Sequence, residues 1–311
     1  MVTPAPAASR AGVAVAVAAG LAAGLAGCGP ELGDAHPWID AADLDGVLRP
    51  ELALDREPIP AATDRLRVVT FNAHYGEDVA ALAAALTDSP DLAGADVVLM
   101  QELEDQPDEG SSRASRLADL LAMNYVYAPA RPSGAGTHGL AILSPHPMAR
   151  VQVMELPHAD IGFHSRRRIA LAADVEIAGV AVRVVDVHLD TRLGVADRLR
   201  QLRPAVIDLD DRVVVGGDLN TLPWAWLEGV VPDLPAQAAL DEDAARAVDE
   251  LMTALDFATP TAALGATDND PILDARLDSL YPRGLGVRDA AVARDVDASD
   301  HFPVRVDLAP P

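Results

Sequence analysis

The chain has 311 residues and a formal net charge of −24, because 48 acidic residues outnumber 24 basic residues that are all arginine. A surface this acidic argues against a broad electrostatic grip on nucleic acid, although it allows a compact site that holds one phosphate through a divalent cation. The single cysteine, Cys28, excludes an internal disulfide and a cysteine-based metal site.

The N-terminus has the pattern of an export signal. Arg10 is the only charged residue before Glu31, and residues 11–26 are an unbroken run of Ala, Val, Gly and Leu. This run is short and rich in small residues, as in the core of a signal peptide. Residues 25–28 (LAGC) resemble a bacterial lipobox. We therefore predict a lipoprotein signal peptide over residues 1–27 and an extracytoplasmic protein anchored to the cell envelope by lipid on Cys28. The alternative is a plain secretory signal with an incidental cysteine.

A composition change separates the N-terminal region from the rest of the chain. Residues 28–63 hold five prolines among scattered acidic residues, which predicts a tether with little regular structure. From Arg65 onward, strand and helix patterns follow one another without a repeat or an internal linker. The sequence therefore predicts a single domain over residues 64–311.

Short apolar runs rich in β-branched residues indicate strands, and apolar residues three and four positions apart indicate helices. In chain order, strands are expected over residues 66–71, 95–100, 125–127, 140–143, 169–176, 180–187, 213–215, 277–281, 287–293 and 304–308. Helices are expected over residues 78–86, 111–123, 196–209 and 242–255. Many short strands with a few helices predict an α/β (α+β) fold, in which two sheets pack face to face with helices outside.

Polar side chains able to bind a metal or a phosphate lie next to five of these strands. They are Asn72, Glu102, His188 with Asp190, Asp218 with Asn220, and the pair Asp300 and His301. Strand ends are where a scaffold displays functional groups, although a single Asn or Asp there is more often turn chemistry. Residues two apart in an extended segment face the same side, so Asp218 and Asn220 are expected to face one reacting group together.

In their order, these segments resemble the motifs of the endonuclease/exonuclease/phosphatase superfamily, which includes deoxyribonuclease I and the neutral sphingomyelinases. The segments are residues 70–72 (TFN), 100–102 (MQE), 138–144 (HGLAILS), 187–189 (VHL), 217–220 (GDLN), 276–281 (RLDSLY) and 299–304 (SDHFPV). Each is weak alone, but seven in order between Arg65 and Leu308 are specific. The resemblance implies a four-layer α/β/β/α sandwich, with two packed mixed sheets flanked by helices.

The resemblance also implies Mg²⁺-dependent hydrolysis of a phosphodiester or phosphomonoester by activated water, with Mn²⁺ as an alternative ion. The metal ligands that it implies are Asn72, Glu102 and Asp300, which offer the oxygen atoms that hard cations prefer. The catalytic residues that it implies are His188, Asp218, Asn220, Asp278 and His301. Of these, His301 is the expected general base and Asp278 orients its ring. Asp218 is expected to position the water, while Asn220 and His188 stabilise the developing charge.

Three consecutive arginines, residues 166–168, precede the strand at 169–176 and are conspicuous in a chain this acidic. We expect Arg167 and Arg168 to bind a substrate phosphate, against the alternative of a solvated turn. The substrate stays open among extracytoplasmic nucleic acid, a phospholipid headgroup and a small phosphoester, and no protein partner is implied. A second class of function is a catalytically idle family member that serves as an envelope-anchored binding module. The intact set of catalytic residues favours the enzyme.

Overall fold

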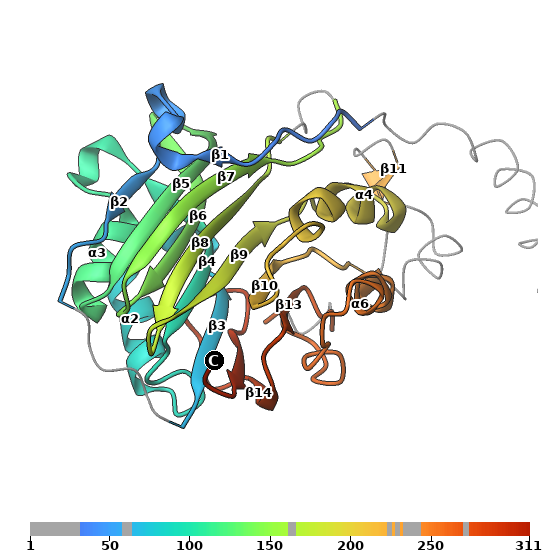
Figure 1. Cartoon of the computed structure of the whole chain (residues 1–311). Coiled ribbons are helices and arrows are strands. Elements are labelled where there is room, and N and C mark those ends of the chain that lie inside the picture. Colours follow the sequence, from blue (N-terminus) through green and yellow to red (C-terminus); the bar gives the residue numbers. More distant parts are fainter. Residues whose placement is uncertain are drawn as a thin grey trace, which may run out of the picture.

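The computed structural model describes residues 32–57, 64–160, 166–222, 226–227, 231–232, 244–269 and 274–311. The predicted signal peptide and Cys28 therefore lie outside the described residues, as do residues 58–63 of the predicted tether. Two sheets pack face to face and carry helices on their outer faces (Figure 1). Among the described residues, no helix is long and apolar enough to cross a membrane.

The larger sheet has seven strands in the order β14-β15-β3-β4-β6-β5-β2. They are β2 (Glu51–Ala53), β3 (Leu66–Asn72), β4 (Val97–Asp105), β5 (Asn124–Ser133), β6 (Gly136–Ser144), β14 (Val287–Val292) and β15 (Val304–Leu308). Strands β3 and β4 run parallel, and the other neighbours are antiparallel. Helices α2 (Val79–Asp88) and α3 (Arg113–Leu121) cover its outer face, and the short 3-10 helices η4 (His74–Gly76) and η5 (Pro107–Glu109) follow β3 and β4.

The second sheet has six strands in the order β1-β7-β8-β9-β10-β13. They are β1 (Ile39–Asp40), β7 (Met148–Glu155), β8 (Ile169–Ile177), β9 (Val180–His188), β10 (Val213–Asp218) and β13 (Asp278–Arg283). Strands β9 and β10 are parallel, and helices α4 (Val195–Val206) and α6 (Ala244–Ala254) pack on the outer face. In the sequence, η2 (Ala41–Asp43) and η3 (Gly46–Leu48) lie between β1 and β2. A separate two-stranded ladder pairs β11 (Trp226–Leu227) with β12 (Val231–Pro232).

Alternation along the strands divides the apolar side chains among three cores. On β9, Val182 and Val184 belong to the core between the two sheets, whereas Val185 and Val187 belong to the core under α4 and α6. A third core lies between the larger sheet and helices α2 and α3. The four-layer α/β/β/α prediction is therefore confirmed.

The core between the sheets becomes polar where β3, β4 and β9 approach their carboxyl ends. Gln101 Nε2 donates to Asp186 Oδ1 at 2.6 Å and to Thr70 Oγ1 at 3.1 Å, so one amide links three strands from both sheets. Asp186 is completely buried, and this burial raises its pKa well above the ordinary value. An uncharged carboxyl group is the form that such burial favours. The strand-end residues lie directly next to this buried polar layer.

The prediction of a tether with little regular structure is wrong for residues 32–57. Strand β1 pairs with β7 at the edge of one sheet, and β2 pairs with β5 at the edge of the other. Pairing at a sheet edge uses backbone groups and needs no apolar run, so a proline-rich and acidic composition concealed these strands. The domain accordingly begins before residue 64. Strand β7 was not predicted either, because Arg150 and Gln152 interrupt its apolar pattern.

Gly217 in β10 has a backbone φ of +137°, and a Cβ atom there would collide with the carbonyl oxygen of Val187 in β9. We expect Gly217→Ala to lower the free energy of unfolding by at least ~2 kcal/mol, because neither backbone can move without breaking the pairing of β9 with β10. Gly286→Ala is the control, since its Cβ would meet only the Ala309 Cβ at 3.5 Å. Denaturant unfolding measures both variants, and equal stabilities would contradict the expectation.

Candidate active site

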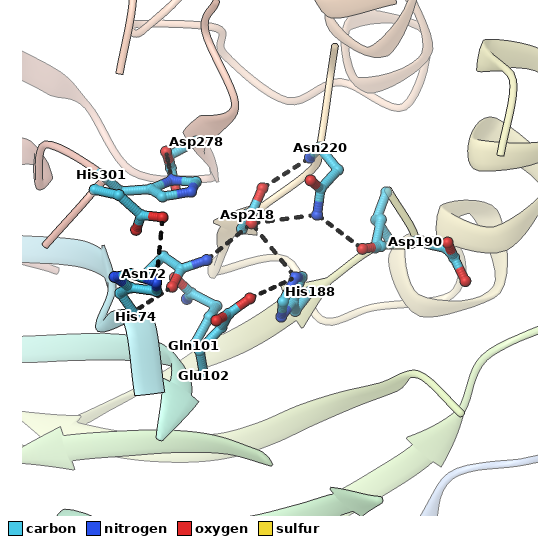
Figure 2. A network of polar contacts seen from close by, with 12 residues as sticks. Asn72, His74, Gln101, Glu102, His188, Asp190, Asp218, Asn220, Asp278 and His301 are labelled. Atoms are coloured by element: carbon cyan, nitrogen blue, oxygen red, sulfur yellow. Dashed lines mark hydrogen bonds and ion pairs between the residues drawn. The ribbon is translucent and has the colours of Figure 1, made fainter. Parts of the chain in front are cut away.

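Strands from both sheets end at one edge of the sandwich and place a cluster of polar side chains there (Figure 2). Asn72 ends β3, His188 ends β9 and Asp218 ends β10, while Asp278 begins β13. The strand register pairs Asp218 with His188 on one side and with Asp278 on the other. The structure therefore brings together the residues that the sequence placed at separate strand ends.

Glu102 reaches this cluster through an irregularity in β4. The pairing of β4 with β6 shifts register between Met100 and Leu103, and Glu102 lies at a φ of +62°. A left-handed conformation is unfavourable for a residue other than glycine and is kept mainly where function requires it. The bulge places Glu102 Oε1 3.7 Å from His188 Nε2.

Asp218 lies at the centre of the cluster, almost completely buried. Its Oδ2 accepts a hydrogen bond from Asn72 Nδ2 at 3.0 Å, its Oδ1 accepts one from the Asn220 backbone at 2.8 Å, and His188 Nε2 lies 3.4 Å from Oδ2. Burial raises the pKa of Asp218 and the Asp278 carboxylate adds to this, whereas His301 lowers it. A carboxylate fixed by several donors is well suited to orient a water molecule.

Asn220 does not offer the donor that was expected of it. Its Nδ2 donates to the carbonyl oxygen of Leu189 at 2.9 Å and to Asp218 Oδ2 at 3.2 Å. Both amide hydrogens are therefore engaged within the protein. Asn220, which has a φ of +49°, orients Asp218 in this structure instead of pointing a hydrogen toward a substrate oxygen.

His301 and Asp278 form the hydrogen-bonded pair that was expected. His301 Nδ1 lies 2.8 Å from Asp278 Oδ2, and Thr267 Oγ1 donates to the same oxygen at 2.7 Å. Burial alone would lower the pKa of His301, but the charge and hydrogen bond of Asp278 raise it to about 10. Because Nδ1 is held, the other ring nitrogen is left for proton transfer. No sequence motif marked Thr267 as a site residue.

His138 on β6 belongs to the motif at residues 138–144 and lies in the site, although the sequence predicted no function for it. The ligand atoms of Glu102, His138 and His188 all lie within 4.8 Å of one another. Burial lowers the pKa of His188 well below its ordinary value and that of His138 to about 3, and Arg168 adds to both shifts. Both imidazoles are therefore neutral. Alternation with Leu140 and Ile142, which face the inter-sheet core, was the signal that His138 points inward.

The three expected metal ligands lie in this region but differ in setting. Asn72 is buried against Asp218, whereas the Asp300 side chain is 53% exposed and its Oδ2 lies 3.7 Å from His74 Nε2. Burial raises the pKa of Glu102; Arg168 and His301 lower it, and Asp300 raises it.

The donor set suits a divalent cation. In addition to the cluster around Glu102, the ligand atoms of Asp218, Asp278 and His301 lie within 4.8 Å of one another. Asp278 Oδ1 is buried and has no hydrogen-bond partner within the described ranges. Carboxylate and amide oxygens close to imidazoles are the ligands that Mg²⁺ and Mn²⁺ accept in proteins.

The two arginines expected to bind phosphate have different surroundings. Arg167 donates through Nε to Glu155 Oε2 at 2.7 Å and through Nη1 to the carbonyl oxygen of Ala130 at 2.8 Å, so its guanidinium is already paired. Arg168 is buried and lines a small pocket together with His138 and His188. Phosphate binding by Arg168 therefore stays a prediction, while Arg167 is held by Glu155 of β7 and the backbone of β5.

A protein-family model described as the endonuclease/exonuclease/phosphatase family matches residues 69–301. No curated protein sequence matches the chain. An endonuclease/exonuclease/phosphatase from Beutenbergia cavernae DSM 12333 is 23% identical, with a TM-score of 0.58, and the match covers 79% of this chain and 72% of that protein.

Two further solved structures share the architecture. The mannosyl-6-phosphatase of Bacteroides thetaiotaomicron VPI-5482 is 15% identical, with a TM-score of 0.54 and coverage of 78% of this chain and 99% of that protein. The human Nocturnin catalytic domain with a bound sulfate anion is 16% identical, with a TM-score of 0.55 and coverage of 83% and 97%. At such identities these likenesses show the fold.

The depressed pKa of His138 predicts an acid-sensitive stability. The unfolded chain takes up a proton on this imidazole below about pH 6.5, whereas the folded protein does so only near pH 3, so stability falls as the pH falls between these values. As the pH falls, we expect the free energy of unfolding of His138→Gln to decrease by ~1.4 kcal/mol per pH unit less than that of the wild type. Denaturant unfolding of the chelator-treated protein between pH 7 and 4 measures it.

The control for this measurement is His36→Gln, which replaces an exposed imidazole. It should keep the pH dependence of the wild type. A His138→Gln protein whose stability falls with pH as steeply as the wild type's would contradict the neutral assignment.

Proposed function

Because this chain belongs to the endonuclease/exonuclease/phosphatase family, we propose that it is a metal-dependent phosphoesterase that hydrolyses a phosphodiester or phosphomonoester by attack of activated water. The observation that carries the proposal is the meeting of Glu102, His188, Asp218 and the hydrogen-bonded pair of His301 and Asp278 at one edge. A protein that only bound a ligand would not need a buried acid, a neutral imidazole and a His–Asp pair together.

The donor set around Glu102 supports the proposed metal requirement. Mg²⁺ or Mn²⁺, when bound by Glu102 with Asn72 and Asp300, would neutralise phosphate charge and polarise the phosphorus centre. Glu102 is the principal ligand in this proposal because its strained backbone turns its carboxylate into the cluster.

Three residues then carry the proton transfer and the charge. Asp218, which is fixed by Asn72 and Asn220, orients the attacking water. Asp278 raises the pKa of His301 to about 10, so His301 is protonated in the free protein. The charge of a bound cation would lower this pKa, and His301 then accepts the proton of the water while Asp278 stabilises the imidazolium. His188 is neutral and donates an N–H to a phosphoryl oxygen as negative charge develops.

We expect His301→Ala and removal of divalent ions by a chelator each to lower turnover at least ~10²-fold, because each removes a group needed in the transition state. Turnover is measured on a panel of DNA, RNA, sphingomyelin, inositol phosphates, p-nitrophenyl phosphate and bis-p-nitrophenyl phosphate, before and after adding Mg²⁺ or Mn²⁺. The exposed His36→Ala is the control and should retain activity.

Activity that survives both treatments would overturn this mechanism. A protein that hydrolyses none of the panel and shows no calorimetric binding of Mg²⁺ or Mn²⁺ would favour the binding module instead.

We further propose that the enzyme works outside the cytoplasm, held at the envelope by lipid on Cys28. The support is the small-residue run at residues 11–26 and the LAGC sequence at residues 25–28. In a bacterial host that processes lipoproteins, we expect the wild type to incorporate an alkyne-labelled palmitate and to sediment with membranes. Cys28→Ser should do neither. An unlabelled wild type, or a variant labelled equally well, would refute the lipid anchor.

A further inference from the structure

A pocket of about 190 Å³ adjoins Glu102 and His138 at the edge of the active site. Four of its eight lining residues are arginines, namely Arg131, Arg166, Arg168 and Arg192. Among the residues that the structure describes, Glu102 and Asp190 are the only carboxylates in its wall. A chain with twice as many acidic as basic residues has thus gathered positive charge at one place beside its reactive centre.

The arginines of this pocket crowd one another. Burial lowers the pKa of Arg131, and the nearby charges of Arg168 and Arg166 lower it further. Bringing like charges together in a partly desolvated site is unfavourable unless an anion joins them. In the free protein the negative charge of Glu102 raises the pKa of Arg131 and so partly offsets the repulsion among the arginines. A cation bound at Glu102 would neutralise that charge.

Arg168 differs from Arg67, a buried arginine that stabilises the fold. Arg67 is also buried, and it donates to both oxygens of Asp307 at 2.8 and 2.9 Å. Arg168 is only 8% exposed, yet its Nε has no hydrogen-bond partner within the ranges that the structure describes. His138 Nδ1 is also buried and makes no hydrogen bond there, but it faces Glu104 Oε1 at 3.9 Å. The buried donor that Arg168 leaves open in the pocket wall indicates a ligand that accepts hydrogen bonds.

We propose that this pocket is a second anion subsite, which binds a phosphate group of the substrate other than the one being hydrolysed. The substrate is therefore a small phosphoester that carries at least two phosphate groups. Arg131 and Arg168 pair with the oxygens of the second phosphate, because a guanidinium matches phosphate geometry with two parallel hydrogen bonds. The identity of the scissile phosphate rests on the proposed function.

A small substrate is favoured over a nucleic acid because the positive charge is local. A polymer needs a continuous basic track along its backbone, whereas the chain as a whole carries a net charge of −24. The pocket has the volume of roughly six water molecules, which suits one phosphate group.

The first test measures binding without catalysis. Full-length protein in excess chelator is titrated with inorganic phosphate by calorimetry. We expect binding at one site, weakened at least ~10-fold by Arg131→Gln and by Arg168→Gln because a charge-assisted bidentate pair is lost. Arg131→Lys keeps the charge but not the planar guanidinium, so its phosphate affinity should be intermediate. This variant also controls for misfolding of Arg131→Gln. Arg200→Gln on the exposed face of α4 is the control.

The second test compares two substrates with the same scissile bond, adenosine 3′-monophosphate and adenosine 3′,5′-bisphosphate. We expect kcat/KM to favour the bisphosphate at least ~10-fold, mainly through KM, and Arg131→Gln to abolish the preference. A short single-stranded oligonucleotide is the third arm. If it is preferred over the bisphosphate, the small-substrate assignment is overturned.

The two proposals fail in different ways. Phosphate binding that depends on Arg131 in a protein without any hydrolytic activity would sink the proposed function and leave the subsite standing. Hydrolysis with phosphate binding and a substrate preference that are both insensitive to Arg131 would sink the subsite and leave the function standing.

Discussion

The close approach of β10 to β9 at Gly217 fixes the geometry on which the site depends. With no side chain at this position, the two parallel backbones come close enough to hold Asp218 level with His188. The antiparallel pairing with β13 then holds Asp278 level with Asp218 from the other side. Three reactive side chains are thus aligned by backbone hydrogen bonds, which are far stiffer than side-chain contacts. The other residues of the cluster are arranged around these three side chains.

The burial of this row sets its electrostatics. Desolvation pushes Asp218 toward its protonated form and His188 toward its neutral form, while Asp278 keeps His301 charged. One environment thereby gives two imidazoles opposite charge states, and this lets one donate a hydrogen bond while the other exchanges a proton. Gln101 and Asp186, which are hydrogen-bonded to each other, are completely buried next to this row.

The sequence predicted what strand periodicity controls and missed what depends on contacts between distant segments. Asp218 and His188 lie side by side, as their strand-end positions predicted, because a buried strand dictates where its last residue points. Edge strands β1 and β2 were missed because their pairing is made by backbone atoms. The engagement of Asn220 and Arg167 by neighbouring groups could not be predicted, since it depends on carbonyl oxygens and a carboxylate from other strands.

The position of Leu32 has a consequence for how the protein would meet its substrates. Leu32 is bridged to Ala159 and packs with Leu193, which directly follows Arg192 of the arginine-lined pocket in the chain. With lipid on Cys28, four residue steps separate the anchor from this docked position, at most ~14 Å of extended chain. The mouth of the site would then open within a few nanometres of the bilayer surface. Bulky polymers would be hindered sterically there, while small solutes could enter from the side.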